Sequence, residues 1–193
     1  IIGKYGAEDP IALPEPTHKH TTIWDAISDL SYLESGEGAE EQMYRNEPKT
    51  DYQRAMRAGS TELFNHVATR HSKVTLDRLR MIAPECGKEM LPEEHHTKSI
   101  YSGTWCRMKK DGIAKTITTR YDTPSSGEFT HPYLDRAITT REAARIQSFP
   151  DTFHFYGSKS SQMKQVIPMW GAEAVTLPPD EIALALRTDR IDG

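Results

Sequence analysis

The sequence of 193 residues contains only two cysteines, Cys86 and Cys106, and they do not form a Cys-x-x-Cys motif. Such sparse cysteine does not predict a disulfide framework, so reduced thiols in a cytosolic protein are the simplest interpretation. The sequence also lacks any apolar run of about eighteen residues, which argues against a membrane-spanning helix. It has no charged start followed by an apolar stretch, so it predicts no secretory signal.

Candidate metal ligands are present but scattered. Their residue types suit zinc, and they are Cys86, His95, His96 and Cys106, with His66 and His71 upstream. Structural zinc sites use two closely spaced pairs of ligands, whereas here the only close pair is two adjacent histidines that point in different directions. The sequence therefore predicts no metal site, and zinc remains an alternative.

Basic residues are fewer than acidic ones, 24 against 28, and they are unevenly distributed. Residues 1–65 carry a net charge of −6, residues 66–170 carry +5, and residues 171–193 carry −3. Within the middle block, residues 98–170 hold eleven bases and six acids. A basic segment inside an acidic chain is typical of a surface that faces phosphates, and a solvated basic face is the alternative.

One stretch, residues 136–151, has a well-marked helical start and stop. Thr139 and Glu142 have the spacing of a capping box, and Pro150 ends the segment. The apolar positions recur at three-residue spacing, which indicates one buried face: Ala143, Ile146 and Phe149. Arg141 and Arg145 are four residues apart and share a different face, where two solvated arginines are the simplest interpretation.

Upstream of this stretch, three shorter helices are indicated. Thr22 and Asp25 predict a capped helix whose apolar face is Ile23, Ala26, Ile27 and Leu30. A second helix is expected over residues 52–58, and a third from Ser72 or Thr75, with Leu76, Leu79 and Ile82 directed inward. Residues 34–51 are rich in Glu and Gly and predict a mobile surface loop.

Residues 100–131 have a pattern typical of strands and turns. Asp111-Gly112 is a tight-turn signal, and residues 116–121 form a run rich in β-branched side chains. Lysines, an arginine and hydroxyl side chains accompany this run, and these are the groups that bind phosphates. The alternative is an ordinary twisted strand with an exposed polar face.

Arg-Glu-Ala-Ala-Arg-x-Gln-x-Phe-Pro-Asp, residues 141–151, resembles the ninth sequence motif of DNA cytosine-5 methyltransferases. Upstream, residues 116–120, 124–127 and 131–132 resemble the end of that family's target-recognition region, and Ile1-Ile2-Gly3 resembles the end of the strand that closes the eighth motif. The resemblance is dense over residues 98–166. Because several elements agree in order and spacing, it is more specific than any single motif.

The resemblance implies a set of DNA-binding residues. In that family a Thr followed by a branched apolar residue helps to hold DNA beside the flipped target cytosine, and Thr116-Ile117 is the best match. The expected DNA-binding residues are Lys109, Lys110, Lys115, Thr116, Ile117, Thr118, Arg120, Ser125 and Ser126. The expected structural residues, which would bridge the recognition region to the catalytic domain, are Arg141, Glu142, Arg145, Phe149 and Pro150.

Other family features are absent or altered in this sequence. The nucleophile of the family lies in a Pro-Cys pair, but here Cys86 follows Glu85 and Cys106 follows Trp105. The Glu-Asn-Val motif and the glycine-rich cofactor loop are also missing, and the tenth motif survives only as an altered sequence over residues 171–179. We therefore expect S-adenosylmethionine to bind mainly to a catalytic part outside this chain, and we assign no cofactor contact or catalytic residue here.

These observations together predict an α+β fold: a small, irregular, β-rich recognition domain plus helices that complete a doubly wound α/β methyltransferase domain. Residues 1–20 would be the end of a catalytic-domain strand and a linker, residues 21–132 the recognition domain, and residues 133–193 helices that pack on the catalytic domain, including a final helix from Pro179. The initial Ile1 suggests a piece of a longer polypeptide.

The expected function is the DNA-recognition part, as a fragment or a smaller subunit, of a restriction-modification enzyme that methylates C5 of cytosine in a specific duplex sequence. Its partners would be double-stranded DNA and a catalytic domain or subunit, in the bacterial cytoplasm near the nucleoid, and the chain alone would be inactive. Two alternatives remain: a non-catalytic DNA-binding or regulatory module derived from the family, and an unrelated metal-binding or interaction domain.

Overall fold

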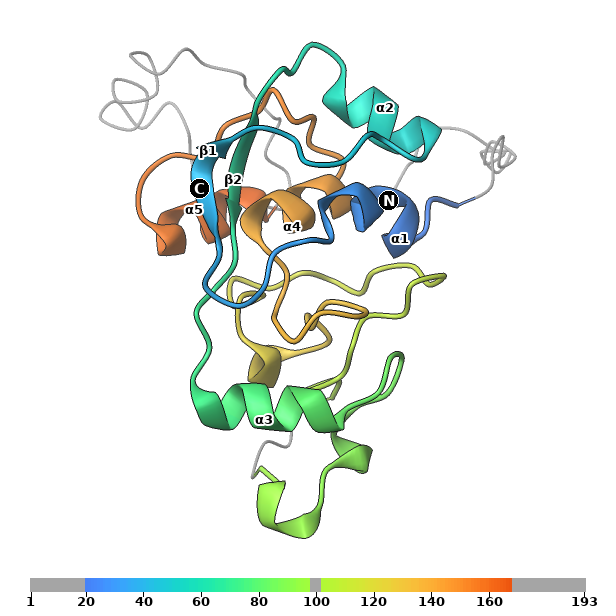
Figure 1. Ribbon diagram of the computed structural model, residues 1–193, viewed down its shortest axis with the longest axis vertical. Helices are drawn as coiled ribbons and strands as arrows, with labels where there is room; N and C mark the ends of the chain where they lie inside the picture. Colours follow the sequence, from blue (N-terminus) through green and yellow to red (C-terminus); the bar gives the residue numbers. More distant parts are fainter. Residues whose placement is uncertain (1–19, 98–101, 168–193) are drawn as a thin grey trace, which may run out of the picture.

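A computed structural model describes residues 20–97 and 102–167 of the chain. The expected strand at Ile1–Gly3, most of the linker, the altered tenth motif and the final helix from Pro179 lie outside these residues. In Figure 1, α1, α2, the β1–β2 pair, α4 and α5 occupy the upper half, and α3 lies in the lower half, with irregular loops above it and part of the segment that follows it below.

The helices expected from capping signals are present. Helix α1 spans Ile23–Ile27 and continues as the 3-10 turn η1, Ser28–Leu30, while α4 spans Thr140–Ile146; both α1 and α4 begin with a complete capping box. Helix α2 spans Asp51–Arg57, and α3 spans Lys73–Met81 with Ser72 as its cap. Helix α5 spans Lys159–Val166, and its cap is Ser158.

The two strands lie where the sequence did not place them. Strand β1, Gly38–Gln42, pairs antiparallel with β2, Leu63–Val67, in a two-stranded sheet. Most side chains of β1 are exposed, so the strand carries no alternating pattern, and the prediction of a loop over residues 34–51 was wrong there. Its position is fixed instead by pairing with β2, which buries Leu63, Asn65 and His66.

The strand expected at residues 116–121 is not formed. Between residues 102 and 131 the structure has irregular backbone, the short 3-10 turn η4 at Pro124–Ser126 and an isolated bridge from Arg107 to Thr130. Tyr121 N donates to Thr118 O at 3.2 Å, which bends the chain at the point where a strand would continue. β-branched residues favour extended backbone, but a strand also needs a partner, and none of the described residues pairs with this run.

The main core joins the N-terminal helices to the C-terminal ones. Ile23, Ala26 and Ile27 of α1 pack with Ala143 and Ala144 of α4 in one buried cluster, and Met163 and Val166 of α5 belong to it. Helix α4 also contacts β2. A separate small cluster under α3 holds Leu79, Ile82, Leu91 and Trp105. No helix among the described residues is long and apolar enough to cross a membrane.

Candidate nucleic-acid interface

Arg145 lies in the core with its side chain fully buried. Its guanidinium donates to both carboxylate oxygens of Asp151, at 2.9 and 2.7 Å, and to Asp29 Oδ1 at 2.7 Å and Ala26 O at 3.2 Å. Although burial opposes its charge, hydrogen bonds and attraction from the two carboxylates raise the pKa of Arg145 above its ordinary value. Arg145 therefore ties α1 to the segment that follows α4.

Arg141, one turn earlier, is also fully buried and binds mainly carbonyl oxygens. It donates to Phe64 O at 2.9 Å, Pro150 O at 3.2 Å and Phe153 O at 2.6 Å. Burial lowers the pKa of Arg141, since its nearest carboxylate, on Asp151, is 3.8 Å away. The two arginines are thus not solvated; they fix the two ends of the Pro150–Phe153 turn to the helix and to β2.

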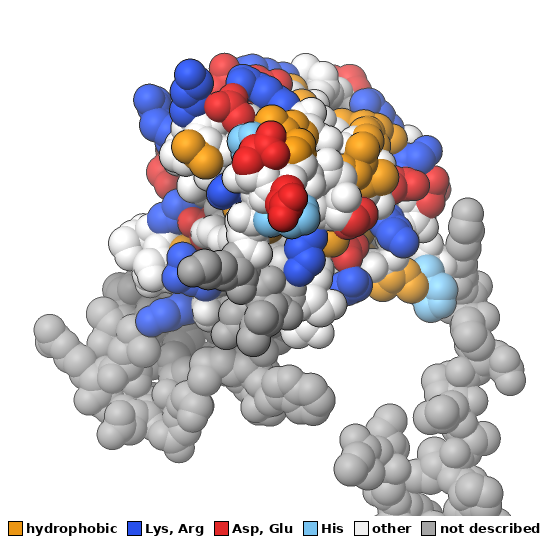
Figure 2. Space-filling model, turned by 90° about the horizontal axis from the view of Figure 1, so that it is seen from below, with side chains coloured by type: hydrophobic (Ala, Val, Ile, Leu, Met, Phe, Trp, Pro, Cys, Tyr) orange, Lys and Arg blue, Asp and Glu red, His pale blue; other side chains and the backbone are white. Residues whose placement is uncertain are grey.

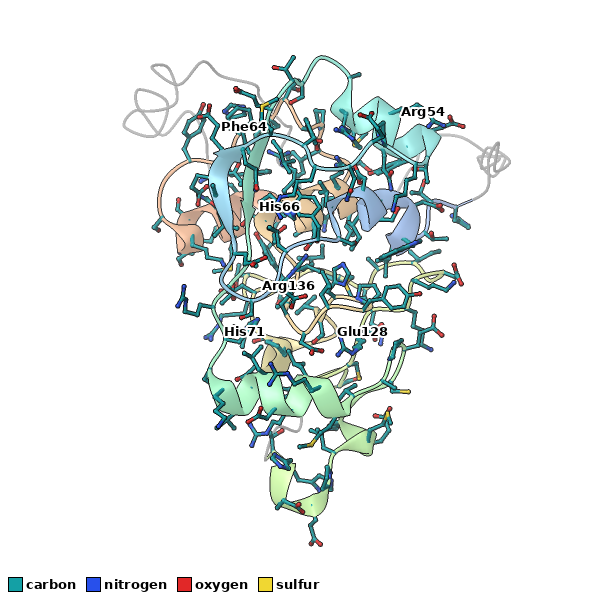
Figure 3. The ribbon with its side chains drawn as sticks, in the orientation of Figure 1. Arg54, Phe64, His66, His71, Glu128 and Arg136 are labelled. Carbon is teal, nitrogen blue, oxygen red and sulfur yellow. The ribbon has the colours of Figure 1, made fainter. Side chains whose placement is uncertain are left out.

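Glu142 completes the capping box of α4 and pairs with a further buried arginine. Arg136 donates to Glu142 Oε2 and Oε1 at 2.7 and 2.8 Å, and to Leu33 O at 2.6 Å. Burial alone would raise the pKa of Glu142, but the Arg136 guanidinium outweighs it and the pKa falls to about 2. Figure 3 shows Arg136 at the centre of the molecule, between its upper and lower halves.

Two buried histidines, His66 and His131, lie near the Arg136–Glu142 pair. His66 Nε2 donates to Leu30 O at 3.1 Å, so its Nδ1 accepts from the Thr139 hydroxyl at 2.9 Å. His131 Nδ1 accepts from the backbone amides of Tyr133 and Leu134, at 3.1 and 3.0 Å, which leaves its Nε2 to donate to Ser31. Burial lowers the pKa of His66 to about 4 and that of His131 to about 3, so both are neutral near pH 7.

Arg107 is a further buried arginine that joins separate segments, in the lower half of the molecule. Its guanidinium donates to the carbonyl oxygens of Ile82, Leu79 and Leu134, at 2.7, 2.8 and 2.8 Å, and pairs with Asp135. Sequence reasoning missed Arg107 and Arg136, because an isolated arginine gives no signal of burial. The irregular loops of residues 102–135 are therefore held to α3 by arginine-to-carbonyl bonds rather than by a sheet.

The predicted DNA-binding run, residues 115–120, lies on the surface; it contains one buried anchor, Ile117, and is followed by a second, Tyr121. The side chains of Ile117 and Tyr121 are 2% and 0% exposed and belong to the main core, so Ile117 can offer only its backbone to a ligand. The Tyr121 hydroxyl donates to Thr140 Oγ1 at 3.2 Å. Thr116, Thr118 and Arg120 are exposed between and beside these anchors. The core thus fixes a short polar segment with its hydroxyl and guanidinium groups outward.

A pocket of about 530 Å³ lies along this run. One side is formed by Lys115, Thr116 and Ile117, and the other by the start of α1 and the end of α4, where Gln147 and Ser148 lie. Ser148 has a positive φ of 65°, and its hydroxyl accepts a hydrogen bond from Tyr52 at 3.1 Å. The pocket therefore joins the predicted run to the end of the Arg141–Arg145 helix, with polar groups from both.

The predicted cations are not equally available. Lys115 pairs with Glu128 at 2.6 Å and Lys110 with Asp111 at 3.3 Å, and these hydrogen bonds raise the pKa of both lysines. The side chains of Lys109 and Arg120 form no hydrogen bond or ion pair with other described residues. Ser125 and Ser126 are half-buried in η4. Figure 2, which views the molecule from below, shows Lys and Arg mixed with Asp and Glu rather than one basic patch.

Neither thiol lines the pocket along the predicted run, although Cys106 lies close enough to Lys115 for their charges to interact. Cys106 is partly buried, and burial and the nearby Glu89 raise the pKa of its thiol. A raised pKa leaves less thiolate, the form that attacks an electrophile. In the described part of the chain, no group of three or more His, Cys, Asp or Glu side chains is arranged to hold a metal ion.

Comparison with known proteins places this geometry in context. The family model for C-5 cytosine-specific DNA methylases matches residues 8–171. The type II methyltransferase M.DdeI of Desulfomicrobium norvegicum is 35% identical over 153 residues, and M.AgeI of Thalassovita gelatinovora is 31% identical over 199 residues. These matches cover 74% and 75% of this chain but only 36% and 46% of the relatives, so the chain spans less than half of their length.

A solved structure from E. coli, described as a DNA modification methyltransferase encoded within a prophage, has a similar fold. It superposes with a TM-score of 0.55 at 20% sequence identity, over 78% of this chain and 43% of the other. At that identity the likeness concerns the fold alone. The relatives include plant proteins too, such as DNA (cytosine-5)-methyltransferase 2 of Arabidopsis thaliana, which is 28% identical over 168 residues.

Proposed function

The chain belongs to the C-5 cytosine-specific DNA methylase family, and on this premise we propose that it carries the DNA-recognition part of a DNA cytosine-5 methyltransferase, as a fragment or as a smaller subunit. In this proposal the described residues hold duplex DNA, and a catalytic domain or subunit supplies the thiolate that attacks C6 of the target cytosine. Two of the relatives named above, M.DdeI and M.AgeI, are type II methyltransferases, which supports a role in restriction and modification.

One observation carries the proposal: two buried side chains, Ile117 within the polar surface run and Tyr121 directly after it, anchor the run in the core. The buried side chains of Ile117 and Tyr121 keep Thr116, Thr118 and Arg120 exposed. Hydroxyl and guanidinium groups bind phosphate oxygens, and phosphate contacts fix the register of a protein on DNA. Because the run does not depend on a loose loop, its contacts with DNA would lose little conformational freedom on binding.

The state of the cysteines supports a catalytic part elsewhere. Neither Cys86 nor Cys106 follows a proline, and the raised pKa of Cys106 disfavours its thiolate. A nucleophilic cysteine needs an electropositive neighbour. Lys115 lowers the pKa of Cys106, but burial and the carboxylates of Glu89 and Glu128 outweigh it, and the pKa is raised. We therefore propose that the chain is inactive alone.

S-adenosylmethionine is the methyl donor of this family, and the pocket along the predicted run does not fit it. This pocket has no Asp or Glu among its lining residues, whereas a ribose and an ammonium group are commonly bound by carboxylates. Its lining is hydroxyl, amide, lysine and apolar side chains. We assign the cofactor to the catalytic part and no cofactor contact to residues 20–97 or 102–167.

Duplex binding tests the proposal. By fluorescence anisotropy with a labelled duplex, the chain should bind in the non-specific regime of roughly 10⁻⁴–10⁻⁶ M at physiological salt, more tightly at lower salt. Thr116→Ala should weaken binding about fivefold, the effect of losing one hydrogen bond worth about 1 kcal/mol. The matched control is Thr61→Ala, an exposed threonine before β2, which should have no effect. Absence of duplex binding at low salt would refute the proposal.

A further inference from the structure

A second pocket, of about 430 Å³, lies between the turn that follows the predicted DNA-binding run and helix α5. The turn contributes Thr119, Arg120, Asp122 and Thr123, and the helix contributes Ser160, Met163 and Lys164. The two walls are far apart in the sequence, so no local motif indicates this pocket. None of the residues from α5 was among the DNA-binding residues expected from the sequence.

Both walls are rigid because each is anchored in the same core cluster. Tyr121 of the turn is fully buried there, and Met163 and Val166 of α5 are 8% and 0% exposed. The turn is closed by Thr123 N donating to Arg120 O at 3.1 Å. The distance between the two walls is therefore set by packing, and a ligand would meet a preformed site.

Two cations, Arg120 and Lys164, line this pocket. Some other exposed cations are paired with a carboxylate, as Arg54 is with Asp51 and Lys115 with Glu128. Arg120 and Lys164 are both exposed, and neither side chain forms a hydrogen bond or ion pair with any residue in the described ranges. Two unpaired cations therefore share one pocket with several hydroxyl groups.

One carboxylate also lines the pocket, and it is engaged elsewhere. Asp122 accepts a hydrogen bond from the Thr123 hydroxyl at 3.1 Å, and the charge of Lys159 lies close enough to interact with it. Lys159, the first residue of α5, in turn donates to the Thr69 hydroxyl. The charges of Asp122 and Lys159 offset one another, so Arg120 and Lys164 give the pocket a net positive charge.

We propose that Arg120 and Lys164, assisted by the Ser160 hydroxyl, bind one backbone phosphate of the DNA. This inference rests on the proposed function and extends the contact surface to α5, which the sequence assigned to packing on a catalytic domain. A guanidinium and an ammonium facing one cavity suit an anion with several accepting oxygens, and a phosphodiester presents such oxygens at regular spacing along the duplex. Lys164 then fixes the position of the protein along the duplex and does not recognise bases.

The test is the salt dependence of duplex binding by the full chain and its variants. A phosphate contact contributes about one unit to the slope of log K against log salt, so Lys164→Ala and Arg120→Ala should each lower the slope by about one. Both should weaken all duplex sequences equally. Lys164→Arg retains the charge and should retain the slope. The matched control is Lys73→Ala, an exposed lysine at the start of α3, which should leave the slope unchanged.

The outcomes separate this inference from the proposed function. A chain that binds duplex with salt dependence, but whose slope is unaffected by Lys164→Ala, would overturn the phosphate site while the DNA-recognition role stands. A slope reduced equally by Lys73→Ala would also overturn it, because the effect would then be one of total charge. A wild-type chain that binds no duplex would overturn both. Circular dichroism of each variant establishes that it is folded.

Discussion

Arg145 and Asp151 form two parallel hydrogen bonds in a fully buried pair, from Nε to Oδ1 at 2.9 Å and from Nη2 to Oδ2 at 2.7 Å. The remaining Nη1 group reaches Asp29, so one guanidinium joins α1, α4 and the turn after α4. This arrangement leaves no part of the Arg145 side chain free for DNA. Arg141 and Arg145 of α4 therefore stabilise the interior, and in our proposal the exposed run of residues 115–120 binds the DNA.

Truncating this pair should be strongly destabilising. Arg145→Ala leaves two buried carboxylates without their main partner, which costs about 3–5 kcal/mol of the free energy of unfolding. Arg145→Lys keeps the charge but loses the parallel bonds, and should fall between wild type and alanine. The control is Arg54→Ala, whose partner Asp51 is 99% exposed, with a loss under about 0.5 kcal/mol. Urea unfolding measures all three, and an Arg145→Lys variant as stable as wild type would contradict this role.

Arg141→Ala and Arg120→Ala should separate structure from binding. Arg141 satisfies three carbonyl oxygens in the core, so its loss should lower the free energy of unfolding by about 2–4 kcal/mol and lower Tm, without changing which sequence is bound. Arg120→Ala should change stability by less than about 0.5 kcal/mol and weaken binding. Thermal unfolding measured beside duplex binding compares them. Intact stability with altered sequence preference in Arg141→Ala would show that the helix reads DNA.

Acidification from pH 7 to pH 5 should destabilise the fold. The folded-state pKa values of His66 and His131 are about 4 and about 3, below their ordinary 6.5, so the unfolded state binds protons first as the pH falls. Stability is therefore full above pH 6.5 and lost on acidification, by about 2 kcal/mol per histidine between pH 7 and pH 5. Glu142, with a pKa of about 2 against 4.5, adds a further loss below pH 4.5.

Urea unfolding at pH 7, 6 and 5 measures this dependence, and NMR of the imidazole rings assigns it to the two histidines. A free energy of unfolding that stays constant over this range would contradict the buried, neutral state of both rings.

The pure chain should transfer no methyl group from labelled S-adenosylmethionine to any duplex. The reason is chemical: Cys106 is disfavoured as a thiolate, and neither cysteine lies in a Pro-Cys pair. Scintillation counting of labelled DNA measures the transfer. Activity that disappears in Cys86→Ser or Cys106→Ser, but persists in the control variant Thr61→Ala, would overturn the division between recognition and catalysis.

The helices were predictable because their signals are local. The capping boxes at Thr22 and Thr139 each lie within four residues, and the structure confirms both. Strand β1 was not predictable, since its exposed glutamates carry no pattern and its place depends on pairing with β2. The strand predicted at residues 116–121 was wrong for the opposite reason. The β-branched residues of this run locally favour a strand, but no described segment pairs with it.

For the candidate site, the sequence identified residue types but not their surroundings. Spacing alone placed Arg141 and Arg145 on one face, but their carboxylate and carbonyl partners come from distant segments such as α1 and β2. Charge alone could not distinguish Lys115, which is paired with Glu128, from Arg120, which is not paired with a described residue. The α5 wall of the second pocket has no sequence signal, because it is formed only by tertiary packing.

Hydrogen–deuterium exchange of the chain, with and without saturating duplex DNA, tests the central claim most directly. No backbone amide of residues 113–118 donates to another described residue, so these amides should exchange fast in the free chain. The account predicts that duplex DNA slows exchange over residues 113–123 and 159–166 and leaves β1 unchanged. Exchange that is unaltered in both of those segments while the duplex is bound, or protection confined to β1, would contradict it.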